Sequence, residues 1–438
     1  MHKKLYFSIF FLGFIFACAL FSACISNSRL PKSTPSGKAL SKDLPSIHPI
    51  YTAYHTSENK TEIYFQIKSN ELLYVRAVET NAKGFVARVK ISYKVVAGYG
   101  STLVSDSASV FFTDTIATEK NENKTINGKF EINVNIGNTN IAEITMLDVN
   151  HNTTAFAYLS LDKKTLKSRQ NFLVCEKNKR EPLFKNYITE NDTLKIIYNK
   201  ISGNKKLFVK YYNREFLLPP PPFSYIERKP IDFNADSIFE LKLDEKFSTI
   251  VILKTKGIYH FVADTADKEG LTIIKQPYEL PALMDAESML KSLRFITTKQ
   301  EYDELLLSDN LKYSLDKYWL KCASNNKEKA RQLLKSYFRR VENSNNYFSS
   351  FDAGWKTDRG LIYLIFGPPN NVFRDNFSET WVYGDENNAM RQVKFSFTKV
   401  ENIFSDNDYI LNRSELYKEL WYSNVDAWRL GRVINDKQ

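Results

Sequence analysis

The hydrophobic pattern of this 438-residue chain changes its period near Pro281. Before that point apolar and polar residues alternate, so that Phe85, Val89 and Ile91 share one face and Arg88 lies on the other. A period of two is typical of antiparallel strands with one solvated face. After Pro281 the apolar residues recur at helical spacing. We therefore predict a multidomain fold, with two all-β domains followed by an α+β domain.

The two all-β domains are expected to be immunoglobulin-like sandwiches spanning residues 47–163 and 164–280. Short strands separated by turn residues, such as Asn127-Gly128 and Gly137-Asn138, favour a sandwich. Pro219 to Pro222 exclude a central strand and favour polyproline II, as a stiff connector or as a docking ligand. Strands are expected at 62–67, 72–78, 85–95, 104–112, 130–136, 141–149 and 154–161, then at 193–198, 206–212, 237–243, 249–254, 257–263 and 271–275.

The α+β domain is expected to span residues 281–438. Thr298 and Glu301 form the pattern of a capping box at the start of a helix. Two further helices are predicted at 311–322 and from 325 or 326 to 348, and a short one at 414–421. A polar loop at 354–360 precedes the apolar run Leu361–Phe366 and a Gly-Pro-Pro stop, which predicts a loop, a buried strand and a turn. Two more strands are predicted at 379–383 and 393–397.

The N-terminus has the pattern of a bacterial lipoprotein signal. Lys3 and Lys4 precede an apolar run from 5 to 21, and Phe-Ser-Ala comes directly before Cys24. These features predict a signal peptide at 1–23, cleavage before Cys24, acylation (palmitate included) of that cysteine, and a flexible tether at 24–46. The alternative is an uncleaved anchor helix. No acidic cluster follows Cys24, so we expect a lipid-anchored protein of the bacterial cell envelope, at the outer membrane and facing the periplasm.

Composition narrows the possible partners and cofactors. The formal net charge is +11, yet residues 281–438 hold 23 Lys and Arg against 22 Asp and Glu, so the surplus of the mature chain lies in the tether and the β-rich part. A basic surface suits anionic lipid headgroups or acidic cell-wall polymers, or serves solubility alone. No nucleic-acid recognition motif is present. Cys175 and Cys322 are expected to be buried thiols, although a disulfide between them stays possible from sequence alone.

The segment from 290 to 435 resembles the GWxTD domain of bacterial proteins. The naming motif is matched by Gly354, Trp355, Thr357, Asp358, Arg359 and Gly360. Tyr363, the turn at 367–369, Glu379, Trp381 and Tyr383 match the elements that follow, whereas Asn370 stands where the family pattern has an acidic residue. The resemblance implies an α+β domain and no particular activity.

The residues of the motif allow a structural, a binding or a catalytic interpretation. None of the five histidines lies in 281–438, which excludes a Ser-His or Cys-His nucleophile and a His-rich metal site there. Asp358 and Glu379 remain as a carboxylate pair for a periplasmic hydrolase of glycan or peptide. Alternatively, Asp358 and Thr357 hold a turn, and Arg359 pairs with a carboxylate.

In the structural interpretation, Trp355 packs the loop, and Gly354 and Gly360 supply backbone angles that other residues resist. A third possibility is a ligand cleft lined by Tyr363, Glu379, Trp381 and Tyr383.

We favour a non-catalytic binding or scaffolding role, with no catalytic residue, no metal and no cofactor. The expected partners are the membrane, through the lipid anchor, and an envelope protein or wall polymer.

Overall fold

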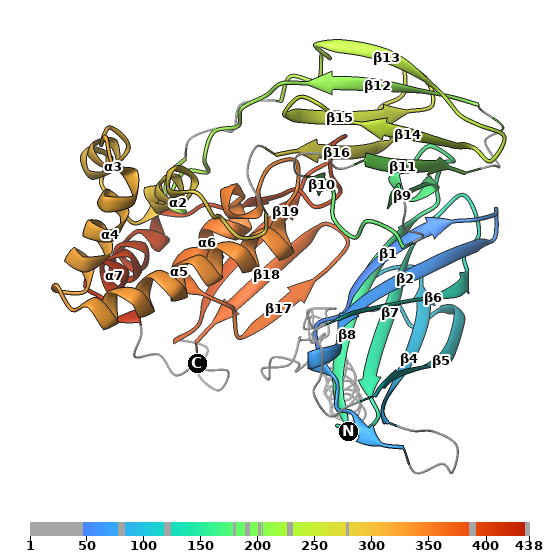
Figure 1. Ribbon diagram of the computed structural model, residues 1–438, viewed down its shortest axis with the longest axis horizontal. Helices are drawn as coiled ribbons and strands as arrows, with labels where there is room; N and C mark the ends of the chain where they lie inside the picture. Colours follow the sequence, from blue (N-terminus) through green and yellow to red (C-terminus); the bar gives the residue numbers. More distant parts are fainter. Residues whose placement is uncertain are drawn as a thin grey trace, which may run out of the picture. The chain divides into compact units, whose positions relative to one another are not determined.

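The computed structural model describes residues 47–433, apart from 78–83, 118–123, 178–180, 189–192, 200–202, 204, 226–230, 277–279 and 385–390. The predicted signal peptide, Cys24 and the tether at 24–46 lie outside the described residues. The chain is mostly β-sheet up to about residue 260 and then largely helical with a small sheet, as the change of hydrophobic period predicts (Figure 1). None of the described helices has both the length and the apolar composition needed to cross a membrane.

The first β-rich region consists of two sheets around one core. One sheet has the order β1-β2-β6, and in the other the strands run β3-β4-β7-β8 with β5 also paired to β4. Alternate residues of each strand enter the core, for example Ile63 of β2 and Ile91 of β4, which is why the period of two was readable in the sequence. The strands are β1 (Ile50–His55), β2 (Lys60–Lys68), β3 (Val75–Arg76), β4 (Phe85–Val96), β5 (Val104–Ile116), β6 (Thr125–Asn133), β7 (Thr139–Asp148) and β8 (Thr153–Asp162).

Asn127-Gly128 is part of strand β6 and not the predicted turn. Gly128 lies opposite Phe65 of β2, and a Cβ on Gly128 would come within 2.4 Å of the Phe65 ring. The glycine therefore makes room for an aromatic side chain from the neighbouring strand, a role of glycine in strands that resembles a turn signal in the sequence. The predicted turn at Gly137 is present, with a φ of 99° at that residue.

The second β-rich region also has two sheets, with the orders β10-β16-β15-β12-β13 and β14-β11-β9. Cys175 in β9 is a buried thiol, and Cys322 is a buried thiol in the helical part, so the two are not joined in a disulfide. The strands are β9 (Phe172–Glu176), β10 (Tyr187–Ile188), β11 (Thr193–Tyr198), β12 (Lys206–Tyr212), β13 (Ser237–Lys242), β14 (Ser248–Ile252), β15 (Gly257–Val262) and β16 (Leu271–Lys275).

A long connection between two neighbouring strands, β12 and β13, leaves the sheet and packs against the helical part of the chain. Its residues Phe216, Leu218 and Phe223 contact the core that the helices form. The ring of Phe216 lies 4.5 Å from that of Phe351, measured between centroids. Pro219–Pro222 lie in this connection outside any strand, as their sequence requires. We call residues 213–225 the connector.

The C-terminal part combines helices with a four-stranded antiparallel sheet of order β17-β18-β19-β20. Side chains of α5 and α6 pack on this sheet, which lies behind these two helices in Figure 1. The elements are α2 (Ala286–Ser292), α3 (Lys299–Leu306), α4 (Leu311–Cys322), α5 (Lys327–Phe348), α6 (Asp358–Phe366), β17 (Asn371–Arg374), β18 (Ser378–Tyr383), β19 (Val393–Lys399), β20 (Tyr409–Leu411) and α7 (Lys418–Arg429). The helix predicted at 414–421 therefore begins later and runs further.

The apolar run Leu361–Phe366 was predicted as a strand, and this prediction is wrong: the run belongs to helix α6. Eight of the nine α6 residues are buried, so polar residues mark no solvent face and the sequence shows no helical period. The helix starts at the N-cap Thr357, whose hydroxyl accepts the N–H of Gly360 at 3.1 Å. It ends at Gly367, which has a φ of 81°, directly before Pro368-Pro369.

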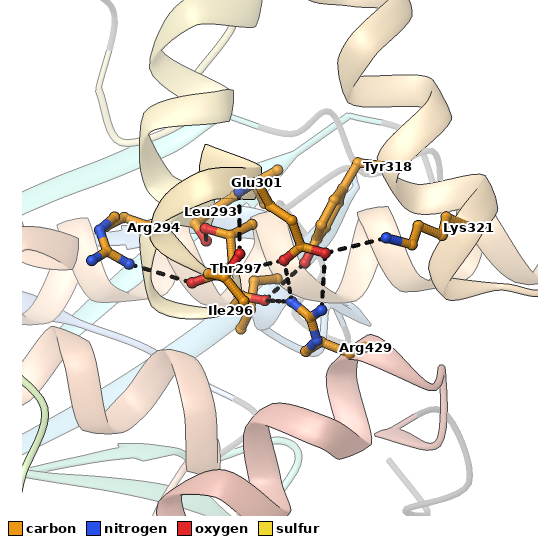
Figure 2. A network of polar contacts seen from close by, with 9 residues as sticks. Leu293, Arg294, Ile296, Thr297, Glu301, Tyr318, Lys321 and Arg429 are labelled. Atoms are coloured by element: carbon orange, nitrogen blue, oxygen red, sulfur yellow. Dashed lines mark hydrogen bonds and ion pairs between the residues drawn. The ribbon is translucent and has the colours of Figure 1, made fainter. Parts of the chain in front are cut away.

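The predicted capping box at Thr298 is confirmed, and its glutamate has a second role. Glu301 accepts the backbone N–H of Thr298 at 3.0 Å and also forms a two-pronged ion pair with Arg429 of α7, at 2.6 and 2.9 Å. Lys321 of α4 reaches the same carboxylate at 3.2 Å. Figure 2 shows these contacts meeting at Glu301, where one side chain ties α3, α4 and α7 together.

Candidate functional site: the signature corner between α5 and α6

The signature residues form a corner in which a short 3₁₀ turn, η6 (Gly354–Lys356), lies between helices α5 and α6. We call residues 354–360 the signature corner. A Cβ on Gly354 would lie 1.9 Å from the carbonyl oxygen of Ser344 in α5, and a Cβ on Gly360 would lie 2.0 Å from that of Gly354. Neither glycine is among the described residues with positive φ. The predicted need for unusual backbone angles is therefore wrong, because the glycines serve close backbone packing instead.

Trp355 fixes the corner by packing and by its backbone. Its side chain is buried in the core shared by the helices, 6.1 Å from the ring of Phe295. Its backbone N–H donates to Oδ1 of Asn345 at 3.2 Å, while Nδ2 of Asn345 donates to the carbonyl of Pro281 at 2.7 Å. The indole N–H of Trp355 has no acceptor among the residues that the structure describes. The tryptophan thus stabilises the corner by burying apolar surface, although its indole N–H is left without a hydrogen bond.

Asp358 faces the protein interior and holds an arginine from beyond β20. Its carboxylate accepts two N–H groups of Arg413, at 2.5 and 3.2 Å, and the backbone N–H of Leu411 at 2.9 Å. The same guanidinium donates to the carbonyl of Pro220 at 3.1 Å. Asp358 also lies in the first turn of α6, where a negative charge is favourable. The signature aspartate therefore links the helix, the sheet and, through Arg413, the proline run of the connector.

Arg359 and Glu379 form a second buried ion pair beside α6. Nη1 of Arg359 lies 3.6 Å from Oε2 of Glu379, and Nη2 donates to the carbonyl and the side-chain oxygen of Asn407, at 3.0 and 2.5 Å. The guanidinium carbon sits 4.1 Å from the centre of the Tyr409 ring, a cation–π contact. Glu379 accepts further hydrogen bonds from Arg374 at 2.8 Å and from the indole of Trp381 at 2.5 Å.

The four residues proposed for a cleft lie in or against a second hydrophobic core. Tyr363, Glu379 and Trp381 are 8, 1 and 1 % exposed, and Tyr383 is half-buried with its hydroxyl donating to the carbonyl of Gly367 at 2.9 Å. Trp381 packs against Phe397 at a centroid distance of 4.9 Å. These side chains fill the space between α6 and the sheet, which favours a packing role over a ligand cleft.

The electrostatics of the corner suit ion pairs and not proton transfer. Burial alone would raise the pKa of Glu379, but Arg374 and Arg359 outweigh it and hold that pKa below its usual range. Burial raises the pKa of Asp352, against the pull of Lys356, whose Nζ lies 3.2 Å from both its carboxylate oxygens. Asp358 and Glu379 each use their oxygens on arginine and other N–H donors, so neither has the freedom of an acid or base catalyst.

Sequence reasoning missed the residues that hold the signature in place. Arg413 and Asn407 lie far from the motif along the chain, and no periodic pattern connects them to it. Asn345 lies on the same face of α5 as Val341 and Phe348 and is fully buried, so its place in that stripe is the signal that could have identified it. No group of three or more His, Cys, Asp or Glu side chains in the described ranges is arranged to hold a metal ion.

Comparison with known families agrees with the motif. The model of the GWxTD domain matches residues 257–430, which include β15 and β16 as well as the helices and the small sheet. The core around the helices likewise takes Ile258 of β15 and Ile274 of β16. The boundary proposed between 280 and 281 stays a prediction. No curated protein sequence matches the chain. The chain therefore contains a GWxTD domain at residues 257–430.

Proposed function

We propose that this protein is a lipid-anchored component of the bacterial cell envelope whose GWxTD domain has a non-catalytic binding or scaffolding role. The observation that supports the proposal most is that the two signature carboxylates are buried and paired with arginines. Asp358 is 9 % exposed and Glu379 1 %, and both are held by arginine side chains. With no histidine in 281–438, the domain has no free acid/base pair at its signature.

The contacts of Arg413 support a scaffolding role. This arginine joins Asp358 to the carbonyl of Pro220, and the N–H of the next residue, Ser414, donates to the carbonyl of Pro222 at 3.0 Å. Each prolyl carbonyl is an acceptor that a polyproline segment leaves unused. The signature thus fixes the connector on the helical part, in line with its interpretation as a stiff element.

A partner protein could bind where the connector meets the start of α7. Leu416 is 88 % exposed, Tyr225 69 % and Tyr422 48 %, and the ring of Tyr422 lies 5.4 Å from that of Phe223. Exposed aromatic and aliphatic side chains beside a rigid polyproline segment are typical of protein–protein contacts. We assign the binding role to this surface, defined by Tyr225, Leu416 and Tyr422.

The test compares proteins that co-purify from membranes with the wild type and with surface variants. Leu416→Ser and Tyr422→Ser should each lose a partner that the wild type retains. Leu307→Ser is the matched control, because Leu307 is 84 % exposed at the end of α3. Equal recovery of every partner by Leu416→Ser, Tyr422→Ser and wild type would contradict the assignment. Trp355→Ala is a poor probe, since removing a buried indole destabilises the fold by about 3–5 kcal/mol.

The lipid anchor rests on the sequence before residue 47. Mass spectrometry of the mature N-terminal peptide should find acyl chains on Cys24, and Cys24→Ala should release the protein from membranes. Protease added to intact cells should leave the chain uncut if it faces the periplasm. An unacylated Cys24 in membrane-bound protein would remove this part of the proposal.

We further propose that residues 47–163 and 164–280 are two immunoglobulin-like sandwiches that act as spacers. In each, residues from two sheets meet in one core, as Phe65 and Val89 do in the first and Ile196 and Phe261 in the second. An experimental structure with a different sheet topology would exclude this.

A hydrolase that uses Asp358 and Glu379 is not favoured. Release of fragments from cell-wall material by the full chain, lost in a folded Asp358→Asn variant, would revive it.

A further inference from the structure

The second β-rich region contains a basic hollow to which neither the family nor the signature assigns a role. It has a volume of about 460 Å³ and is lined by Lys177, Lys195, Lys242, Asp244, Ser248, Thr249 and Ile250. We call it the lysine hollow. Three cations and one carboxylate line this small space, which lies where β11 and β14 of one sheet meet the end of β13 of the other.

The strand register explains why the lysines gather there. Lys195 of β11 lies opposite Cys175 of β9 and opposite Ile250 of β14. Lys177 follows Cys175 by two residues, so it points to the same side of the sheet as Lys195. On the opposite side, Leu194, Ile196 and Val251 fill the core. Lys177 and Lys195 therefore lie on the side of this sheet that faces away from the core, and Lys242 comes from the end of β13 in the other sheet.

No described carboxylate forms an ion pair with any of the three lysines of the hollow. Across the described ranges, none of the three lysines has a carboxylate oxygen within the 4.0 Å of an ion pair, whereas nearby Lys205 and Lys206 pair with Glu245 and Glu240. Lys177 and Lys242 are exposed and Lys195 is half-buried.

The carboxylate of the hollow, by contrast, has partners of its own. Asp244 accepts the hydroxyl and the N–H of Ser248, at 2.7 and 2.8 Å, and the N–H of Lys246 at 2.8 Å. These bonds close the turn between β13 and β14 and, with a smaller contribution from Lys195, lower the pKa of Asp244. The acid therefore shapes the turn, and the hollow keeps an excess of positive charge.

We propose that the lysine hollow binds the phosphate group of an anionic ligand. Lysine ammonium groups are strong point-charge partners for phosphate, and three of them line the hollow. Ile250 is 53 % exposed and Ile252 58 % on the same face, which gives the glycerol and first acyl carbons of a phospholipid an apolar contact. A lipid headgroup and free phosphate are both sources of this group. The site is separate from the GWxTD domain's signature, so its failure would leave the proposed function standing.

The test measures lysine reactivity on the full chain in a neutral detergent. An amine-reactive acetylating reagent is applied with and without inorganic phosphate or water-soluble dihexanoyl phosphatidylglycerol, and peptide mass spectrometry reads each lysine. Lys177, Lys195 and Lys242 should be protected, and exposed Lys254 should not. Protection by both probes means that phosphate suffices, and protection by the lipid alone means that its apolar part is needed; either result supports the site. Dihexanoyl phosphatidylcholine, whose headgroup is neutral overall, should protect less.

Variants give the second measurement. Removing one lysine charge should weaken probe binding about fivefold, the factor that corresponds to ~1 kcal/mol per lysine. Lys177→Gln and Lys195→Gln should show this loss, and Lys254→Gln should not. Equal protection of Lys254, equal weakening by Lys254→Gln, or no saturable protection by either probe would overturn the proposal.

Discussion

Gly360→Ala distinguishes the packing role of the signature glycines from any role in backbone flexibility. Gly360 lies inside the first turn of α6, where alanine is intrinsically favoured over glycine by about 1 kcal/mol. On helix propensity alone, the change should stabilise the protein. The structure predicts the opposite sign, because the new Cβ would lie 2.0 Å from the carbonyl oxygen of Gly354.

The magnitude follows from what the displaced carbonyl does. Ordinary contact begins at 3.4 Å, so the two backbones must separate by 1.4 Å (3.4 minus 2.0). The Gly354 carbonyl accepts the hydroxyl of Thr357 at 2.8 Å and its N–H at 3.1 Å, and this movement strains both bonds. Overpacking costs about 3 kcal/mol and a weakened N-cap about 1 kcal/mol, against a gain of about 1 kcal/mol from helix propensity. The net expectation is a loss of about 3 kcal/mol in the free energy of unfolding.

Tryptophan fluorescence during urea unfolding measures this loss where it occurs. All five tryptophans of the chain lie between residues 319 and 428, so the signal reports on the GWxTD domain. With a urea m-value of about 1–3 kcal/mol per M, the midpoint should fall by about 1–3 M. Gly98→Ala is the control, since its Cβ would meet only the end of the Asn376 side chain, at 3.1 Å. A midpoint for Gly360→Ala at or above that of the wild type would refute the reasoning.

Three further predictions concern titration and reactivity. Burial lowers the pKa of both His55 and His260 to about 4. Between pH 6.5 and 4 only the unfolded state takes up these protons, so the free energy of unfolding should fall by up to about 3 kcal/mol for each histidine as the pH drops through that range. Ring-proton NMR that gives both histidines a pKa near 6.5 would contradict this. Hydrogen bonds and ion pairs lower the pKa of Glu301 to about 2. Its contribution to the free energy of unfolding, about 1–2 kcal/mol after solvent screening, should disappear as pH falls from 4.5 towards 2. Urea midpoints measured across this pH range should show the loss in the wild type and not in Glu301→Gln. Burial raises the pKa of Cys175 to about 11 and that of Cys322 above its usual value. Iodoacetamide should therefore label neither cysteine before the protein unfolds. Rapid labelling of the native chain would argue against the burial of these thiols.

The shared core also bears on which fragments can be studied. The core of the helical part includes Tyr187, Tyr212, Ile258 and Ile274, all from the second β-rich region. A fragment that begins at residue 281 would expose its side of that interface. Experiments on the GWxTD domain are therefore best done on the full chain.

The sequence determined several elements that have one solvated face. Strands β11 and β12 begin and end at the predicted residues, and α5 starts directly after the expected cap at Asn326. In these elements polar residues mark the face that meets water, so the period can be read from the residues alone. The motif likewise identified the GWxTD domain from a few residues in order.

Only the tertiary structure decided the elements and contacts that have no solvent face. Helix α6 is apolar on almost every side, so its period is invisible in the sequence and it resembles a buried strand. The partner of Asp358 is Arg413, and nothing local in the sequence selects that arginine over the others of the domain. These pairings depend on which distant segments meet in the core. The physical reason is that a buried charge is stable only beside an opposite charge or hydrogen-bond partner in space, and that partner need not be near it along the chain.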